Sequence, residues 1–222
     1  MTEPVSGNGE TPTSAVLVFG DRRVPRPLRG LAALRPASRA DSNTLDAAVG
    51  PHRRLVVLGD DADLAAVLTR LLRAERLDVE VAYVPRRRTA ATRAYRLPSG
   101  HRAARRARRG AAHRVPLIRD DTGCAIAGRA RWLPADDGLP LHGEAIVDDT
   151  TLFDGDVAAV RIEPTRALPG LRARVSGRGW VPGRAAQLGC TGVIVVRDGV
   201  AAPRPARRST LYRHVEGWLA VG

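Results

Sequence analysis

The stretch that decides the fold is Leu55-Val56-Val57-Leu58-Gly59-Asp60-Asp61-Ala62, and a helical pattern continues from it to Arg73. Its four apolar residues predict a buried strand, and the apolar residues that follow recur at the spacing of one helix face. Asp60 and Asp61 both suit the N-cap of that helix. A further apolar run at 79–84 predicts a second strand. Strand, turn, helix and strand in this order make a βαβ unit, which implies a parallel sheet with a right-handed crossover.

The rest of the first half fits the same α/β pattern. The apolar run 15–20 predicts a strand, and short helices are expected near 44–49, 90–95 and 102–112. Aromatic residues make up only 4% of the chain, so we expect a core of Leu, Val and Ala. We therefore expect an α/β domain with a parallel sheet over residues 15–115.

The pattern changes after residue 115. Short apolar runs recur there at fairly regular spacing between Gly, Pro and Asp, which is typical of a β-sandwich. Only the segment 183–188 suggests a helical turn. We therefore expect a β-rich, sandwich-like domain over residues 116–222, and its exposed strand edges make a homodimer a reasonable expectation.

The N-terminal segment 1–14 is polar and contains Pro, Gly, Thr and Ser. It has no apolar core beside positive charge, so we expect a flexible leader and no signal peptide. No stretch of the sequence approaches the roughly 20 apolar residues that a membrane-spanning helix needs. Together these features predict a cytoplasmic protein.

Positive charge is concentrated in one segment. The chain has a formal net charge of +13, and every one of its 36 basic residues is an arginine. Eleven of these lie between Arg86 and Arg114, where there is no Asp or Glu. A patch of one sign attracts polyanions, so we expect an anionic partner.

This arginine segment divides into two zones. The run 85–89 (Pro-Arg-Arg-Arg-Thr) follows a predicted strand, and it therefore faces the same edge of the sheet as Gly59. Because arginine forks onto two phosphate oxygens, these three arginines predict contact with a phosphate or a phospholipid head group. The second zone, 102–109, spreads arginine around most of a helix. For this zone the sequence leaves two interpretations equally open: an anion-binding site, or a segment that is merely solvated.

The Gly59-Asp60-Asp61 turn lies at the carboxyl end of a strand and opens a helix. Open α/β sheets bind ligands at such positions. Two adjacent carboxylates argue against bare phosphate there, unless a Mg²⁺ ion lies between them. The alternative is structural: Asp60 caps the helix and Asp61 stabilises its dipole. The sequence leaves both interpretations open.

Other common chemistries find no support in the sequence. Cys124 and Cys190 are too few for a disulfide framework and have no Cys/His cluster for a metal, so we expect two buried cysteines. His142-Gly143-Glu144 lacks the second histidine of a zinc-peptidase motif. The acidic residues at 148–149 and 154–156 fit turns. The sequence contains no Walker A loop, G-x-G-x-x-G loop or Ser/His/Asp constellation.

The order of these pieces resembles the diacylglycerol kinase / NAD kinase superfamily over most of the chain after residue 15. That family joins an α/β domain to a β-rich one, and its nucleotide site uses a strand–GGDGT–helix turn and a following P-x-G-T-x-N-D-type loop. The turn 58–62 is similar to the first motif, the segment 83–92 to the second, and Val195–Val200 to a late Asp-Gly-Glu strand. The resemblance implies one site with Asp198 as its candidate catalytic base. Its implied nucleotide- or phosphate-binding residues are Gly59, Asp60, Asp61, Arg86, Arg87, Arg88 and Thr89.

The motifs depart from the family pattern at positions that carry chemistry. Leu58 and Asp61 replace glycines of the first turn, and Ala91-Thr92 replaces Asn-Asp in the second loop. The early phosphate loop of the family is replaced by residues 20–23, and Val200 stands where an acidic residue would help to deprotonate a lipid hydroxyl. Phosphoryl transfer depends on positioning and charge neutralisation, so we predict weak or absent catalysis.

We therefore predict a degenerate lipid-kinase-like protein that binds a nucleotide or a phospholipid at a cleft between its two domains, with ATP and Mg²⁺ as candidate cofactors. One alternative is an active lipid or small-molecule kinase in which Asp60 and Asp61 hold Mg²⁺ and Asp198 is the base. Another is a basic protein that binds nucleic acid or a membrane surface. Tyr95 is the only aromatic residue inside the arginine segment, which disfavours single-strand recognition through base stacking.

Overall fold

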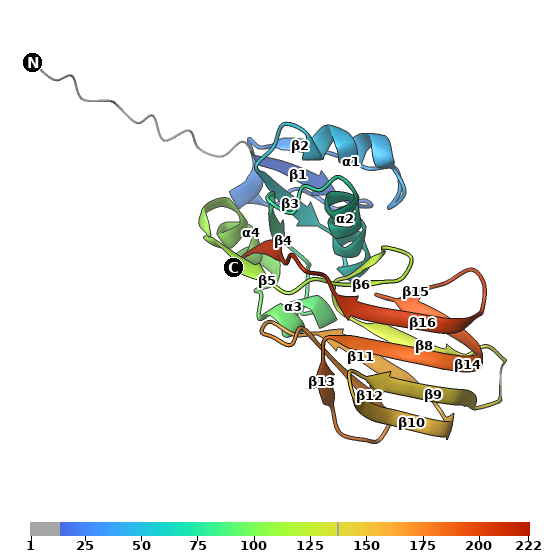
Figure 1. Cartoon of the computed structure of the whole chain (residues 1–222). Coiled ribbons are helices and arrows are strands. Elements are labelled where there is room, and N and C mark those ends of the chain that lie inside the picture. The colour runs from blue at the N-terminus through green and yellow to red at the C-terminus, as the bar shows by residue number, and fades with distance from the viewer. Residues whose placement is uncertain (1–13, 137) are drawn as a thin grey trace, which may run out of the picture.

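The computed structural model describes residues 14–136 and 138–222, so the predicted leader lies outside the described residues apart from Ser14. The chain forms two stacked parts, an α/β part and a β-rich part (Figure 1). The first is built on a mostly parallel sheet, sheet A, and the second on a large antiparallel sheet, sheet B. The predicted fold class, an α/β domain followed by a β-rich domain, is confirmed.

Sheet A has the strand order β2-β1-β3-β4-β17-β5, and within it only β5 pairs with its neighbour in the antiparallel direction. The last strand of the chain, β17, returns from the β-rich part and lies between β4 and β5. The strands of this sheet are β1 (Ser14–Val18), β2 (Ala32–Leu34), β3 (Arg54–Leu58), β4 (Glu80–Tyr83), β5 (Ala112–Val115) and β17 (Trp218–Val221).

Helices cover both faces of sheet A. All five residues of β3 are buried, as expected for a parallel strand between two layers. Leu55 and Val57 pack in one core with α1 and α2, whereas Val56 and Leu58 pack in another with α4. None of the helices in the described ranges is long and apolar enough to cross a membrane. The helices are η1 (Arg26–Leu28), α1 (Ser42–Val49), α2 (Asp61–Arg73), α3 (Ala90–Tyr95) and α4 (Gly100–Arg109).

Two local predictions are wrong. The helix expected over 102–112 is α4, which ends at Arg109, because the Arg54 guanidinium donates hydrogen bonds to the carbonyls of Ala107 and Gly110 and so satisfies the helix end. Residues 183–188 form no helical turn; apart from a bend at Arg184, they belong to β13 (Val181–Gly183) and to the start of β14 (Ala185–Arg197). The small residues at the beginning of β14 obscure the alternation of apolar and polar residues that is typical of a strand.

Sheet B has the order β13-β12-β11-β8-β14-β16-β6-β7, and the hairpin of β9 and β10 joins it through β14. Its core surrounds the fully buried Trp132. The strands, besides β13 and β14, are β6 (Ile118–Asp120), β7 (Ala125–Ile126), β8 (Ala130–Pro134), β9 (Leu141–Val147), β10 (Thr150–Val157), β11 (Val160–Pro164), β12 (Leu171–Val175), β15 (Val200–Ala201) and β16 (Ala206–Arg213).

The two parts are fastened together at α2 and α3. The Tyr95 ring fixes α3 within the α/β part, where it packs edge-on against Trp218 of β17 with 5.2 Å between ring centroids and its hydroxyl donates to the Pro116 carbonyl at 3.1 Å. From this position α3 contacts β11 of sheet B, and α2 contacts β7. The Ala125 N–H donates to the Thr69 hydroxyl of α2 at 2.9 Å. These contacts hold the β3–α2 turn and the start of α3 beside the loops of sheet B.

Candidate functional site

The β3–α2 turn is held by a network of charges. Asp60 is the N-cap of α2: its carboxylate accepts the Asp63 N–H at 3.0 Å, and the Asp63 carboxylate accepts the Asp60 N–H at 2.8 Å. Arg39 donates to both carboxylates. Partial burial opposes ionisation of Asp60, but the Asp63 N–H and the Arg39 charge hold its pKa below the ordinary value, whereas burial raises the pKa of Asp63. The Asp60 carboxylate is therefore occupied in capping α2.

Gly59 and Thr89 shape the backbone on either side of Asp61. A Cβ at Gly59 would lie 2.6 Å from the Asp63 side chain, so only glycine allows this close approach. Thr89 is the N-cap of α3, where its hydroxyl accepts the Thr92 N–H at 3.2 Å and the Thr92 hydroxyl accepts the Thr89 N–H at 2.7 Å. Both residues thus set the course of the chain around the Asp61 carboxylate.

Asp61 bridges the two strand ends of the βαβ unit. One carboxylate oxygen accepts the Tyr83 hydroxyl at 2.8 Å, and the other accepts the Ala91 N–H of α3 at 3.2 Å. Burial and the negative charge of Asp61 raise the pKa of Tyr83, which therefore keeps its proton and donates it. Gly128 from the β-rich part packs directly against Asp61 and Ala91. A Cβ at this position would lie 2.7 Å from the Asp61 carboxylate and 2.6 Å from the Ala91 nitrogen, so there is no room for a side chain.

Asp198 lies on the other side of Gly128, in the turn between β14 and β15. Its carboxylate accepts three backbone N–H groups, from Ala127 at 2.8 Å, Gly128 at 2.7 Å and Arg129 at 2.8 Å. Burial raises the pKa of this carboxyl to about 7 against the effect of these donors, and the charge of Asp61 adds to the rise. The structure thus brings Asp61 and Asp198 together as a pair of interacting carboxyls.

The three arginines of the run 86–88 are exposed and lie at different places. Arg86 lines a hollow of about 690 Å³ at the carboxyl ends of β1, β3 and β4, which we call the edge hollow. Arg88 lines a different hollow of about 750 Å³ beside α3 and α4. Arg87 lines neither. The arginines predicted to act as one phosphate-binding group are therefore separated.

Comparison with protein-family models gave no match, and comparison with curated proteins gave none either. Solved structures do match. A protein of Bacillus anthracis str. Sterne proposed to be a diacylglycerol kinase superimposes with a TM-score of 0.72 at 10% identity, over 95% of this chain and 97% of that one. An NAD kinase from Archaeoglobus fulgidus in complex with ATP gives a TM-score of 0.61 at 12% identity, over 94% and 93% of the two chains. The yeast NADH kinase complexed with NADH gives 0.63 at 9% identity, over 96% and 84%.

The chain has the diacylglycerol kinase / NAD kinase fold. The resemblance drawn from the sequence is confirmed at this level, since likeness at such low identity concerns the fold and not the activity. Within the kinase fold, the altered GGDGT-like turn is the β3–α2 turn, and the Asp-Gly of the late strand lies at Asp198 and Gly199 between β14 and β15.

The carboxylates of this kinase fold fit Mg²⁺ poorly. Asp60 is paired with Arg39, and both oxygens of Asp61 accept hydrogen bonds from protein donors. Among the residues that the structure describes, no group of three His, Cys, Asp or Glu side chains could hold a metal ion. Cys124 and Cys190 are both free and half-buried, so the expectation of two buried cysteines is met only in part.

Sequence reasoning missed three residues that contribute to the site. Gly128 packs on Asp61, but the two residues are far apart in the chain and no motif connects them. Arg22 and Arg23 line the edge hollow with Arg86. Their position after the first strand, where the kinase fold carries a phosphate loop, is the signal that points to them.

Proposed function

We propose that the protein is a catalytically degenerate kinase-fold protein that binds an anionic ligand, a nucleotide or a phospholipid, and transfers phosphoryl groups weakly or not at all. The observation that carries this proposal is the Asp61 carboxylate, which takes up the Ala91 N–H and the Tyr83 hydroxyl beside Asp198. Glycine stands at this position in the GGDGT motif that the turn resembles, and it would leave the space open.

Asp61 disfavours binding of the phosphoryl group that a kinase would transfer, for two reasons. Its oxygens already hold the donors at this position, at 2.8 Å from the Tyr83 hydroxyl and 3.2 Å from the Ala91 nitrogen. Together with Asp198 it also sets two carboxyls where phosphoryl transfer requires positive charge to neutralise the transition state. A phosphate would have to displace these hydrogen bonds and then face like charge.

The cleft between the two parts offers few free cations to an anion. A hollow of about 340 Å³ lies between α2 and the loops of sheet B. Three of its arginines, Arg39, Arg70 and Arg197, are each paired with an aspartate. An incoming anion would have to compete with these existing ion pairs, which disfavours this hollow as the ligand site.

The edge hollow is the better candidate for the ligand. Arg22, Arg23 and Arg86 line it, and none of the three forms an ion pair with a residue in the described ranges; Asp21 is the acidic residue of the lining. Ligands of open α/β sheets bind outside the carboxyl ends of the strands, where this hollow lies. Two of the solved structures with this fold are complexes with ATP and with NADH, which are anionic nucleotides, and this supports the same ligand class here.

A thermal-shift panel with ATP, NAD and anionic phospholipid tests the proposal. A ligand present at 100 times its Kd stabilises the folded state by about 2.7 kcal/mol, so the melting temperature should rise measurably with at least one of the three. The variant Arg22→Gln/Arg23→Gln/Arg86→Gln should lose that rise. The matched variant Arg204→Gln/Arg207→Gln/Arg208→Gln changes three exposed arginines of the β-rich part and should keep it. No shift with any ligand, or equal loss in both variants, would refute binding at the edge hollow.

One observation favours a second candidate, an active kinase with Asp198 as general base. A carboxyl whose pKa is raised to about 7 is well matched to accept a proton at neutral pH. This candidate predicts transfer of labelled phosphate from ATP to a lipid mixture, and loss of that transfer in Asp198→Asn. Transfer by the wild type at the roughly 1–100 s⁻¹ typical of kinases would establish it and overturn the degenerate assignment.

A further inference from the structure

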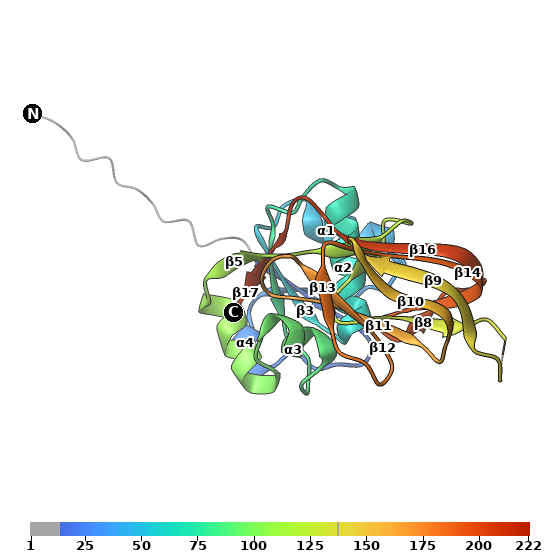
Figure 2. The ribbon, with the colours of Figure 1, turned by 60° about the horizontal axis from the view of Figure 1, so that its bottom comes forward.

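The hollow beside α3 and α4 gathers arginines from both predicted zones. Arg88, Arg93, Arg96, Arg102 and Arg106 line its volume of about 750 Å³. Figure 2 shows α3 and α4 next to each other below the strands of sheet A. The sequence separates 86–88 from 102–109, but the folded chain places Arg88 with the second zone. The second zone is therefore part of a built concave surface and not an isolated solvated helix.

These five arginines have no acidic partner in the described part of the chain. No hydrogen bond or ion pair is formed by any of their guanidinium groups with a described residue, whereas Arg39 and Arg54, which serve the fold, are both paired with carboxylates. Alanines 103, 104 and 107 hold α4 against sheet A, so its arginines are presented outward. The positive charges of these neighbouring guanidinium groups repel each other. A bound anion would offset this repulsion.

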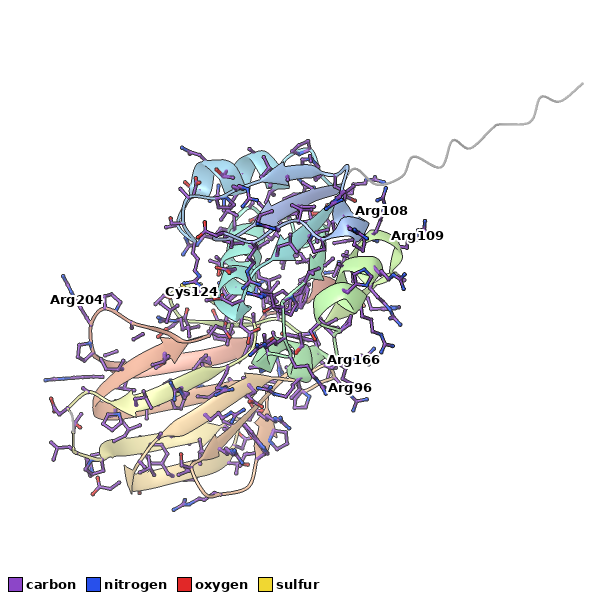
Figure 3. The ribbon with its side chains drawn as sticks, turned by 180° about the vertical axis from the view of Figure 1, so that it is seen from behind. Arg96, Arg108, Arg109, Cys124, Arg166 and Arg204 are labelled. Carbon is purple, nitrogen blue, oxygen red and sulfur yellow. The ribbon has the colours of Figure 1, made fainter. Side chains whose placement is uncertain are left out.

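The positive surface continues beyond the first hollow. A second hollow of about 250 Å³ shares Arg96 and Arg106 with it, and a third of about 570 Å³ shares Arg93 and Arg96. Both reach Arg166, in the loop between β11 and β12. Figure 3 places Arg96 and Arg166 side by side. We call the five arginines and Arg166 together the arginine groove. It is longer than one phosphate needs.

We propose that the arginine groove binds a flexible single chain of phosphates, through charge and without reading bases. Single-stranded nucleic acid and inorganic polyphosphate share this chemistry. Each guanidinium can fork onto two phosphate oxygens. Among the described residues that line these hollows, the one Phe, Tyr or Trp is Tyr95, which is buried and therefore cannot stack on a base. A membrane surface is the less suitable occupant, since a flat bilayer cannot follow a concave path.

The groove and the edge hollow share no lining residue, so variants can test them separately. The probes are a fluorescent 20-nucleotide oligo(dT), a mixed-sequence RNA of the same length, and long-chain polyphosphate as competitor, with anisotropy as the readout. Single-strand binding falls with salt at a slope of about −0.7 per phosphate contacted. Six contacts, one for each arginine of the groove, give a slope of about −4.2, so Kd should rise about 300-fold between 50 and 200 mM salt.

The variant Arg93→Gln/Arg102→Gln/Arg106→Gln should weaken binding and reduce the slope to about −2.1, because three of the six arginines remain. The matched variant Arg204→Gln/Arg207→Gln/Arg208→Gln removes the same charge from the β-rich part and should keep the wild-type slope; Figure 3 shows Arg204 far from the groove. Circular dichroism should be unchanged in both, because none of the six guanidinium groups is paired with a described residue.

Binding of either phosphate chain with loss in the groove variant alone supports the proposal, and the competition arm shows which chain is preferred. Three results would overturn it: equal weakening by the two triple variants, an affinity that differs more than tenfold between base sequences, or binding to anionic vesicles with no binding to either chain.

Discussion

The substitution Asp198→Asn examines the carboxyl pair at the centre of the kinase fold. The Asp198 carboxylate accepts N–H groups from three successive residues of the loop 127–129. Asparagine keeps one oxygen and turns an NH₂ group toward at least one of these donors. The lost hydrogen bond to a buried donor costs about 1–3 kcal/mol at any pH. A second contribution, from titration of the Asp198 carboxyl, does depend on pH, and the experiment isolates it.

The wild-type carboxyl titrates with a pKa of about 7 when folded and about 3.9 when unfolded. Between these values the folded state binds more protons than the unfolded state, so the free energy of unfolding falls as pH rises through this window. Between pH 5 and pH 8 the loss is about 2–3 kcal/mol. Asparagine does not titrate, so the Asp198→Asn variant should not show this loss of unfolding free energy.

Urea denaturation of both proteins, followed by circular dichroism at pH 5, 6, 7 and 8, measures the difference. The destabilisation caused by Asp198→Asn should shrink by about 2–3 kcal/mol from pH 5 to pH 8, and titrating groups that do not interact with Asp198 cancel in the comparison. If the two stability curves run parallel, the three N–H donors keep Asp198 ionised throughout, and the argument from burial and the Asp61 charge is refuted.

Three further substitutions probe the same contacts by urea denaturation. Gly128→Ala should destabilise the fold by about 1–3 kcal/mol, because the new Cβ would lie 2.6 Å from the Ala91 nitrogen; an unchanged midpoint would show that the loop moves freely. Tyr83→Phe removes the hydroxyl that donates to Asp61 and should cost about 1.5–3 kcal/mol, and a smaller cost would mean that water replaces it. Asp60→Ala removes the N-cap of α2 and should cost about 1–2 kcal/mol, while Asp60→Asn, which can still cap, should cost less; equal costs would locate the effect in the Arg39 ion pair.

The parts of the fold that follow from local pattern were predictable. The strand at Leu55–Leu58, the α2 helix and the strand near 79–84 come from hydrophobic periodicity and a clear N-cap, and the helix expected at 90–95 is α3. The end of α4 could not be predicted, because Arg54, distant in the chain, satisfies its last carbonyls. The short strand residues at 185–188 look helical only because Ala and Gly mask the alternation of their neighbours.

The candidate site divides in the same way. The Gly59–Asp61 turn and Asp198 follow from motif-like spacing, and the structure brings Asp61 and Asp198 together. The roles proposed for Arg86, Arg87 and Arg88 rested on their adjacency in sequence. Exposed side chains that are adjacent in sequence can point into different hollows, and these do. Which arginines share a hollow depends on tertiary packing, in this case the position of α4 against sheet A.

Transfer of labelled phosphate from ATP to a diacylglycerol-containing lipid mixture, with the protein at stoichiometric concentration and sampling from seconds to hours, tests the central claim most directly. With the Asp61 carboxylate holding the Tyr83 and Ala91 donors, we predict labelled lipid at the level of the protein-free control. Rapid transfer by the wild type that is lost in Asp198→Asn would contradict the degenerate assignment.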